Sequence, residues 1–178
     1  MRKLEITEMH RLSVGQFKEA SKLPVAVLLD NVRSLHNIGA VFRTADAFRI
    51  EKLCLCGITG TPPSAEIHKT ALGAEDSVAW QYFADSMDAA RNLKDEGFVL
   101  AALEQAEGSV MLDAWQPDTS VKYALVIGNE VHGVDQRLVD ECDVCLEIPQ
   151  AGTKHSLNVS VATGIALWEF FKCFCGRI

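Results

Sequence analysis

The segment 159–171 constrains the fold of this chain more than any other part of its sequence. Read as a helix, it carries apolar side chains around almost its whole circumference. A helix of that kind is buried on more than one side. In a chain of 178 residues, we expect the subunit core to cover one side and a second copy of the chain to cover the other. The helix therefore predicts a homodimer.

The residues before this helix form a polar loop between two buried elements. The apolar run 144–148 is expected to be a strand, and Pro149 ends it because proline cannot donate to a strand ladder. Short polar side chains follow, and Ser156 or Asn158 can cap a helix N-terminus. The loop is either an ordinary strand–loop–helix connection or a binding loop, and the rest of the chain decides between the two.

Further apolar runs alternate with helical patterns along the chain. Continuous apolar runs suit strands that are buried on both faces of a parallel sheet. We expect strands at 25–29, 52–56, 78–83, 98–103 and 123–127, and helices at 38–48, 67–73, 86–96 and 135–140. This alternation predicts an α/β fold with a mainly parallel sheet flanked by helices. A single domain over 1–178 is expected, with 1–22 as a polar lead-in.

Composition narrows the class of protein. Hydrophobic residues make up 48% of the chain, which is typical of a globular protein. No apolar run is long enough to span a bilayer and no signal peptide is visible, so we expect a cytoplasmic protein without a membrane partner. The formal charge of −7 argues mildly against a nucleic-acid partner, although such binding needs only a local basic patch.

The six cysteines have spacings that resemble zinc sites; they are Cys54, Cys56, Cys142, Cys145, Cys173 and Cys175. Three of them fall in expected strands and two fall at the end of the last helix, and no histidine pairs with them at finger spacing. Free cysteine often behaves as a small buried hydrophobe. We therefore expect no metal site.

Four loops leave the carboxyl ends of strands with concentrated polar or glycine-rich sequence, after Leu29, Leu103, Ile127 and Ile148. Ligands of open α/β sheets bind at such ends, so the four loops predict one composite site. The chain has neither Gly-x-Gly-x-x-Gly after its first strand nor a P-loop, which argues against dinucleotide and P-loop enzymes. No Gly-x-Ser-x-Gly surrounds Ser156, which argues against a serine hydrolase.

The helix expected at 38–48 has an apolar stripe, and Arg43 lies off that stripe among small residues. Long side chains on a helix lean toward its N-terminus, so Arg43 can reach back toward the Asn37 loop. It can equally be a surface arginine that covers apolar neighbours. Gly39 is costly inside a helix, and the close approach of another group would explain it.

Three motifs of the chain together resemble those of the SpoU (TrmH) family of RNA 2′-O-ribose methyltransferases, in the SPOUT superfamily. They are Asn37-Ile-Gly-Ala-Val-Phe-Arg43-Thr-Ala, Leu125-Val-Ile-Gly-Asn-Glu130-Val-His-Gly and Ile148-Pro-Gln-Ala-Gly-Thr-Lys-His-Ser156-Leu-Asn158-Val-Ser-Val-Ala. The motifs occur in the family's order, and the likeness covers nearly the whole chain from Val25. The resemblance implies a deep trefoil knot in 122–172, which general folding rules would not predict. It also implies a homodimer in which residues of both subunits complete each site.

The resemblance implies S-adenosylmethionine as the cofactor, held largely by backbone groups of the knot. The matching positions are Leu103, Glu104, Ile127, Gly128, Asn129, Glu130, Ile148, Pro149, Ser156, Leu157 and Asn158. RNA is the implied substrate, and the basic groups expected near the site are Arg33, His36, Arg43, His68, Lys69, Lys154 and His155. A compact subunit fits a tRNA enzyme slightly better than an rRNA enzyme, and the acidic balance elsewhere leaves room for a helper protein.

The implied reaction moves a methyl group from a sulfonium to a ribose hydroxyl, which must lose its proton as it attacks. The resemblance places Arg43, Asn37, Glu130, Ser156 and Asn158 at catalytic positions. A guanidinium is effectively always protonated, so we expect Arg43 to stabilise the developing alkoxide while it grips a phosphate, rather than to act as the base. Glu130 would hold the arginine or complement the sulfonium.

The remaining residues of that set would orient the arginine or the ribose; they are Asn37, Ser156 and Asn158. Ser156 and Asn158 also have a purely structural interpretation as cap or turn residues. Two alternatives to a tRNA methyltransferase stay open from the sequence. One is an rRNA 2′-O-methyltransferase, and the other is a non-catalytic RNA-binding module that retains the knot.

Overall fold

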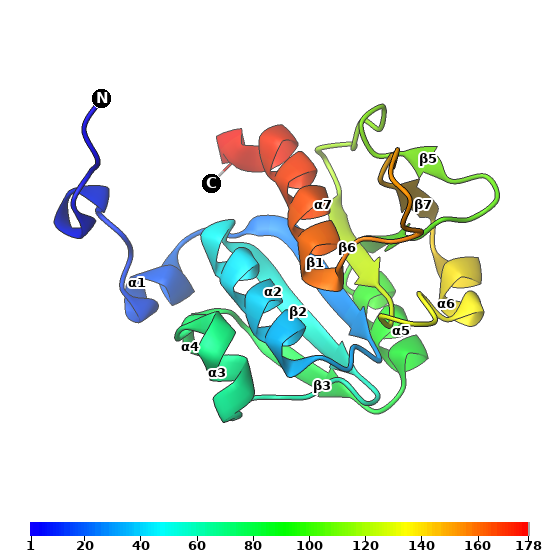
Figure 1. The fold of residues 1–178 in the computed structure, drawn as a ribbon, viewed down its shortest axis with the longest axis horizontal. Coiled ribbons are helices and arrows are strands. Elements are labelled where there is room, and N and C mark those ends of the chain that lie inside the picture. The colour runs from blue at the N-terminus through cyan, green and yellow to red at the C-terminus, as the bar shows by residue number, and fades with distance from the viewer. Residues whose placement is uncertain (178) are drawn as a thin grey trace.

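The chain folds into a seven-stranded sheet with helices on both faces (Figure 1). The computed structural model describes residues 1–177, apart from the side chains of Ile6 and Arg177. Ile178, the last residue of the domain expected from the sequence, lies outside the described residues.

The strands of the sheet run parallel in the order β3-β2-β1-β6-β4-β7-β5. Their bounds are β1 Leu23–Asp30, β2 Ile50–Cys56, β3 Trp80–Phe83, β4 Phe98–Leu103, β5 Val110–Met111, β6 Lys122–Ile127 and β7 Val144–Glu147. The three central strands, β1, β6 and β4, are almost wholly buried, as their continuous apolar runs predict. The expected α/β fold with a parallel sheet is confirmed.

Two groups of helices cover the two faces of the sheet. Their bounds are α1 Val14–Glu19, α2 Leu35–Ala47, α3 Ala65–Ala71, α4 Ala74–Ser77, α5 Ser86–Asp95, α6 Gln136–Glu141 and α7 Val159–Phe174, with 3-10 turns η1 Ile6–Met9 and η2 Cys175–Arg177. Buried side chains of α1, α2, α3, α4 and α7 belong to one apolar cluster. Those of α5 and α6 belong to a second cluster, which packs on the other face of the sheet.

Side-chain caps fix where the helices near the site begin. Ser34 Oγ accepts a hydrogen bond from the backbone N–H of Asn37, so α2 begins at Leu35. The prediction that this helix begins at 38 is therefore wrong by about a turn, and Asn37 belongs to the helix rather than to the loop before it. Asn158 caps α7, because its Oδ1 accepts the N–H groups of Ser160 and Val161.

The sequence pattern predicts neither β5 nor α4. These elements have two and four residues, and segments that short show no periodicity. The helix predicted at 67–73 begins at Ala65 instead, because Ser64 caps it, and it ends in left-handed conformations at Leu72 and Gly73. Side-chain caps therefore set where these helices begin, and the apolar pattern of the sequence does not reveal them.

The last third of the chain crosses the carboxyl end of the sheet. β6 fills the place between β1 and β4, and β7 lies beyond β4. From β7 the chain returns to the opposite side of β4, where α7 packs against α2 and β1 (Figure 1). The loops that follow β4, β6 and β7 therefore lie at one edge of the sheet.

The helix α7 has a buried side and an exposed apolar side. Leu167 and Phe170 are fully buried in the core of the subunit, as predicted for one side of this helix. On the other side, Val161, Ile165 and Trp168 are 50%, 38% and 48% exposed. These three residues form a stripe along the helix, which we call the α7 stripe.

Gly39 on α2 marks a close approach between α2 and α3. A Cβ atom at this position would lie 2.1 Å from Thr70 Oγ1 and 2.3 Å from the carbonyl oxygen of Ile67. The contact that the sequence suggests for this glycine is therefore present. We predict that Gly39→Ala lowers the free energy of unfolding by about 1–3 kcal/mol, because overpacking outweighs the better helix propensity of alanine.

Chemical denaturation of purified protein measures this change. Gly15→Ala in α1 is the matched control, because a Cβ there meets no atom within 4 Å. The control should leave the free energy of unfolding equal or slightly higher. A similar result for Gly39→Ala would contradict the close packing of α2 on α3.

Candidate functional site at the carboxyl ends of three strands

A cleft of about 340 Å³ opens at the carboxyl ends of β4, β6 and β7. It lies where open α/β sheets bind their ligands. Its walls are the three loops that follow these strands and the beginning of α7. The lining residues are Leu103, Glu104, Gln105, Ile127, Gly128, Asn129, Glu130, Val131, His132, Gly133, Ile148, Gln150, His155, Ser156, Leu157, Val159 and Ala162.

The loop after β6 is a tight turn closed by backbone contacts. Asn129 and Gly133 exchange two backbone hydrogen bonds, each of 2.9 Å. The Asn129 side-chain oxygen also accepts the N–H groups of Val131 and His132 at 2.8 and 3.2 Å. A Cβ at Gly128 would lie 2.0 Å from the carbonyl carbon of Gly133, so only glycine fits there.

Glu104 joins the loop after β4 to the loop after β6. Its carboxylate accepts the backbone N–H of Val134 at 2.9 Å and that of Gln105 at 2.9 Å. Gln105 in turn donates from its side-chain amide to the carbonyl oxygen of His155 at 2.9 Å. These contacts tie together all three loops that line the cleft.

Glu130 joins the loop after β6 to the N-terminus of α2. Its carboxylate accepts the backbone N–H groups of Arg33 and Ser34 at 2.9 and 3.0 Å, and the side-chain amide of Asn37 at 3.0 Å. A carboxylate at a helix N-terminus is also stabilised by the helix dipole. Within residues 1–177 of the single chain the carboxylate is occupied by these three donors and makes no hydrogen bond or ion pair with Arg43.

The environment of Glu130 changes its acidity. Burial alone raises the pKa of a carboxyl group, but hydrogen bonds to the ionised form lower it. For Glu130 the hydrogen bonds from Arg33, Ser34 and Asn37 outweigh burial, and its pKa lies below the ordinary value. Glu130 is therefore a carboxylate at neutral pH.

Asn37 and Asn158 continue this network to α7. The Asn158 side-chain amide donates to Asn37 Oδ1 at 3.1 Å, while Asn158 Oδ1 caps α7. The cap interpretation of Asn158 therefore holds, and the same residue also links α7 to α2. Ser156 is exposed and lines the cleft. Its hydroxyl forms no hydrogen bond with any residue in the described range 1–177.

Arg43 lies apart from the cleft. It lines a separate hollow of about 510 Å³ on the exposed side of α2, together with Ala40, Thr44, Ala47, Phe48, Lys69 and Thr70. Within residues 1–177 its guanidinium has no hydrogen-bond or ion-pair partner. Of the two interpretations that the sequence leaves open for Arg43, the single chain shows the exposed surface arginine. The structure brings together Asn37, Glu130 and Asn158, but it leaves Arg43 outside.

The basic residues predicted to face RNA form two groups. Lys154 and His155 are exposed on the loop before α7, and His155 lines the cleft. The second group lies on and near α2 and α3, where ion pairs to glutamate occupy several of its members. These residues are Arg33, His36, Arg43, His68 and Lys69, and the pairs are His36–Glu66, His68–Glu75 and Lys69–Glu66.

Sequence reasoning missed several residues that line the cleft: Gln105, Val131, His132, Gly133, Gln150, Val159 and Ala162. Helical spacing could have found the last two, because positions i and i+3 at the start of α7 share a face. The two predicted cofactor residues that do not line the cleft are Pro149 and Asn158. Each of them lies between two residues that do line the cleft.

Three general features of the described chain bear on the kind of site. In residues 1–177 no three histidine, cysteine or acidic side chains are grouped so that they could hold a metal ion. The six cysteines are present as free thiols. None of the helices described combines the length and apolar character that a membrane crossing needs.

Comparison with known families identifies the class of protein. A family model described as the SpoU rRNA Methylase family matches residues 24–168. The chain belongs to the SpoU family. The match includes all three loops of the cleft and the first part of α7.

Solved structures support this assignment. An AdoMet-bound rRNA methyltransferase from Sinorhizobium meliloti is 32% identical with a TM-score of 0.78, over 88% of this chain and 59% of that one. The A. aeolicus TrmH/SpoU tRNA modifying enzyme is 28% identical with a TM-score of 0.80, over 92% of this chain and 83% of that one. These likenesses confirm the SPOUT α/β-knot fold that the motifs imply.

Another relative also matches this chain over only part of its own length. The 23S rRNA (guanosine-2′-O-)-methyltransferase RlmB of Vibrio vulnificus is 32% identical over 146 residues, which are 82% of this chain and 58% of that protein. The chain thus spans about three fifths of the length of this relative and of the Sinorhizobium meliloti enzyme.

The lowered pKa of Glu130 predicts a pH-dependent contribution to stability. Because the folded-state pKa lies below that of the unfolded chain, the carboxylate stabilises the fold at pH values above about 4.3, the ordinary glutamate value. That contribution is lost as the pH falls through the folded-state pKa. We predict that Glu130→Gln is less stable than the parent at pH 7, by about 1–3 kcal/mol.

Chemical denaturation at pH 7 and at several values below 4.3 measures the difference between the two proteins. The difference should shrink as the pH is lowered. A difference that stays constant with pH would show that the charge of Glu130 does not hold the N-terminus of α2.

Proposed function

We propose that this protein transfers a methyl group from S-adenosylmethionine to a ribose 2′-hydroxyl in RNA, with tRNA as the substrate. The observation that carries this proposal is the cleft, because each of its three loops contains sequence of the family. The structural neighbour from Sinorhizobium meliloti is described as AdoMet bound. We assign the cleft to the same cofactor in this chain, because its three loops lie within the family match.

The residues of the cleft suit this cofactor. Its volume of about 340 Å³ falls within the range of small-molecule sites. Apolar side chains at the ends of β4 and β6 and in the loop after β7 can enclose an adenine ring; they are Leu103, Ile127, Ile148 and Leu157. The carboxylate of Glu130 favours a positively charged sulfonium. When bound, the cofactor supplies an activated methyl group.

We assign cofactor binding to the lining residues Leu103, Glu104, Ile127, Gly128, Asn129, Glu130, Ile148, Ser156 and Leu157. Pro149 and Asn158 shape the ends of the loop that carries Ser156 and Leu157. Glu104 acts mainly by holding the loop after β6, since its carboxylate already accepts two backbone N–H groups. Ser156 has a free hydroxyl at the cleft, which suits it to orient the ribose.

A homodimer explains why Arg43 lies outside the cleft of its own subunit. Trp168 of the α7 stripe contacts Phe48, with ring centroids 6.1 Å apart, and Phe48 lines the hollow that contains Arg43. At the other end of α7, Leu157 lines the cleft and is 37% exposed. The exposed apolar surface therefore runs from the cleft to the Arg43 hollow.

A two-fold axis that crosses the α7 stripe at right angles to the helix would pack the two α7 helices antiparallel, with the same patch used on both subunits. The Trp168 end of one α7 helix, which lies next to the Arg43 hollow, would then be near the Leu157 end of the other α7 helix, which lies next to the cleft. Arg43 of one subunit would face the cleft of its partner, where its fixed positive charge stabilises the developing alkoxide. The hydrogen bond between the side chains of Asn37 and Asn158 fixes the position of α2 relative to α7, and with it the position of Arg43.

One likeness supports tRNA as the substrate. The A. aeolicus tRNA modifying enzyme matches 92% of this chain with a TM-score of 0.80. The exposed basic residues Lys154 and His155 lie beside the cleft, where an RNA backbone would pass.

Cofactor titration and methyl transfer test the proposed function together. Purified protein should bind S-adenosylmethionine or S-adenosylhomocysteine in calorimetry without added metal, and it should methylate unmodified bulk tRNA. Ribose-methylation mapping of the product then locates the nucleotide. Methylation of rRNA alone would favour the rRNA alternative. Cofactor binding without transfer to either RNA would favour the non-catalytic module or the need for a helper protein, and binding of neither nucleoside would contradict the methyltransferase.

Replacing Arg43 separates catalysis from cofactor binding. Arg43→Ala should slow methyl transfer on the order of 10²–10³-fold, because a preorganised charge at the developing alkoxide is lost. Cofactor affinity and stability should stay near the parent values, since Arg43 is exposed and does not line the cleft. Arg43→Lys should restore activity only in part, because an ammonium cannot make the planar two-point contact with a phosphate.

Single-turnover transfer assays, calorimetry and melting curves on each variant give the three readouts. Lys69→Ala is a suitable control, because Lys69 lines the same hollow but pairs with Glu66. It should weaken RNA binding rather than slow transfer at saturating RNA. Parent-like transfer by Arg43→Ala would overturn its catalytic role.

A charge on the α7 stripe should disrupt the dimer. Trp168→Glu is expected to yield monomers in sedimentation at micromolar concentration, because an obligate apolar interface does not tolerate an unpaired carboxylate. Transfer should be lost while cofactor binding is retained. Trp80→Glu is the matched control, because Trp80 is 36% exposed on β3, away from α7. A parent protein that is monomeric at micromolar concentration would contradict the dimer.

A further inference from the structure

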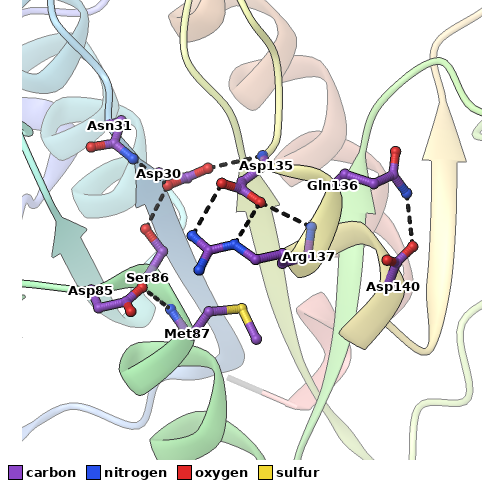
Figure 2. A network of polar contacts seen from close by, with 9 residues as sticks. All are labelled: Asp30, Asn31, Asp85, Ser86, Met87, Asp135, Gln136, Arg137 and Asp140. Carbon is purple, nitrogen blue, oxygen red and sulfur yellow. Dashed lines mark hydrogen bonds and ion pairs between the residues drawn. The ribbon is translucent and has the colours of Figure 1, made fainter.

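A second polar cavity, of about 300 Å³, lies at the carboxyl end of β1 on the face covered by α5 and α6. The N-terminal ends of both helices meet there, and Figure 2 shows the side chains that they contribute. Its charged members are Asp30, Asp85, Asp135 and Arg137. It shares no lining residue with the cofactor cleft.

Asp30 is the buried centre of this cavity. It is 2% exposed, and its two carboxylate oxygens have different partners. Oδ1 accepts the side-chain amide of Asn31 at 2.8 Å and the hydroxyl of Ser86 (Figure 2). Oδ2 accepts the backbone N–H of Asp135 at 3.1 Å. The positive ends of the α5 and α6 dipoles favour a carboxylate at this position.

The contact with Asp135 matters because Asp135 ends the loop that follows β6. The start of the same loop is also tied to the end of β1, since Asn129 donates from its side-chain amide to the carbonyl oxygen of Asn31 at 2.7 Å. On the other side, Glu104 holds the N–H of Val134 at 2.9 Å. Residues 129–135 are thus held at both ends by strand termini.

We propose that Asp30 is a positioning residue for the cofactor cleft, acting through its hydrogen bond to the Asp135 N–H to fix the loop 128–134. This inference rests on the proposed function, because it assigns a role in cofactor binding to a residue that does not touch the cleft. Hydrogen bonds from N–H groups to a carboxylate are among the strong ones in proteins, which suits a clamp on a loop of seven residues.

The remaining groups of the cavity act locally. Asp85 caps α5 by accepting the N–H of Met87, and it has no contact with the loop. Arg137 pairs with the side chain of Asp135 through two contacts of 3.2 Å. Asp30 is therefore the one side chain of this cavity that holds the loop backbone, within the residues described.

Two substitutions test the clamp at its acceptor. Asp30→Asn keeps the size of the side chain but removes its charge, and it leaves one acceptor oxygen for the three donors from Asn31, Ser86 and the Asp135 N–H. Asp85→Asn makes the same chemical change in the same cavity, and asparagine caps a helix as well as aspartate does. Asp30→Asn should weaken cofactor binding on the order of tenfold, and Asp85→Asn should leave it unchanged.

A second pair of variants tests the clamp at its donor. Asp135 has a φ of −53°, which lies within the range of proline. Asp135→Pro removes the N–H that Asp30 accepts, whereas Asp135→Ala keeps that N–H. Both variants lose the side-chain cap of α6. Only the proline variant should reproduce the effect of Asp30→Asn, and this pair decides the question if Asp30→Asn fails to fold.

Hydrogen exchange of the loop amides is the readout that does not depend on the cofactor. Asp30→Asn and Asp135→Pro should speed exchange in 128–134, while exchange in β2 and α3 stays at the parent rate. In methyl transfer, both should raise KM for S-adenosylmethionine and leave kcat at saturating cofactor near that of the parent. A residue needed only for global stability would raise exchange everywhere.

The outcomes separate the inference from the proposed function. Parent-like exchange and parent-like KM in both clamp variants would overturn the role of Asp30 while leaving the methyltransferase intact. Equal effects of Asp135→Pro and Asp135→Ala would also overturn it, because the loss would then belong to the cap of α6. If the parent binds no S-adenosylmethionine, the proposed function fails, and the role of Asp30 in cofactor binding fails with it.

Discussion

The hydrogen bonds that hold residues 128–135 are the interactions on which the rest of the site depends. Gly128 lies against Gly133 so closely that no side chain fits between them, and this fixes the turn after β6. Carboxylates at the ends of β1 and β4 then accept the N–H groups of Asp135 and Val134. From the turn itself, Glu130 extends to the N-terminus of α2. One loop thus sets both the wall of the cleft and the start of the helix that carries Arg43.

Much of the fold was predictable because its strands are continuous apolar runs. The strand 98–103 has the predicted bounds, and the parallel sheet follows from strands that alternate with helices. The start of α2 was not predicted, because the cap is Ser34, one turn before the apolar stripe begins. The knot of the fold was implied by the family motifs and could not follow from periodicity, which carries no information about the path between distant elements.

Part of the candidate site could also be predicted from the sequence. The motifs located most of the residues that line the cleft, because they lie in loops that directly follow strands. Gln105 and Gln150 were missed because their place depends on how three loops meet, which is a contact between residues far apart in sequence. The sequence left open whether Arg43 reaches toward Asn37 or lies on the surface, and the side chain of Asn37 is already hydrogen-bonded to Glu130 and Asn158. The proposed role of Arg43 therefore requires a second subunit.

The location of the cofactor site is measured by hydrogen exchange with and without saturating S-adenosylhomocysteine, because exchange maps the bound molecule onto the chain without an RNA substrate. A site in the cleft predicts slower exchange in 103–105, 127–134 and 150–157, which include the three loops of the cleft. Exchange in α3 and α5, which contribute nothing to the cleft, should not change. Protection confined to other segments, or none at all under saturating conditions, would contradict a cofactor site built on these three loops.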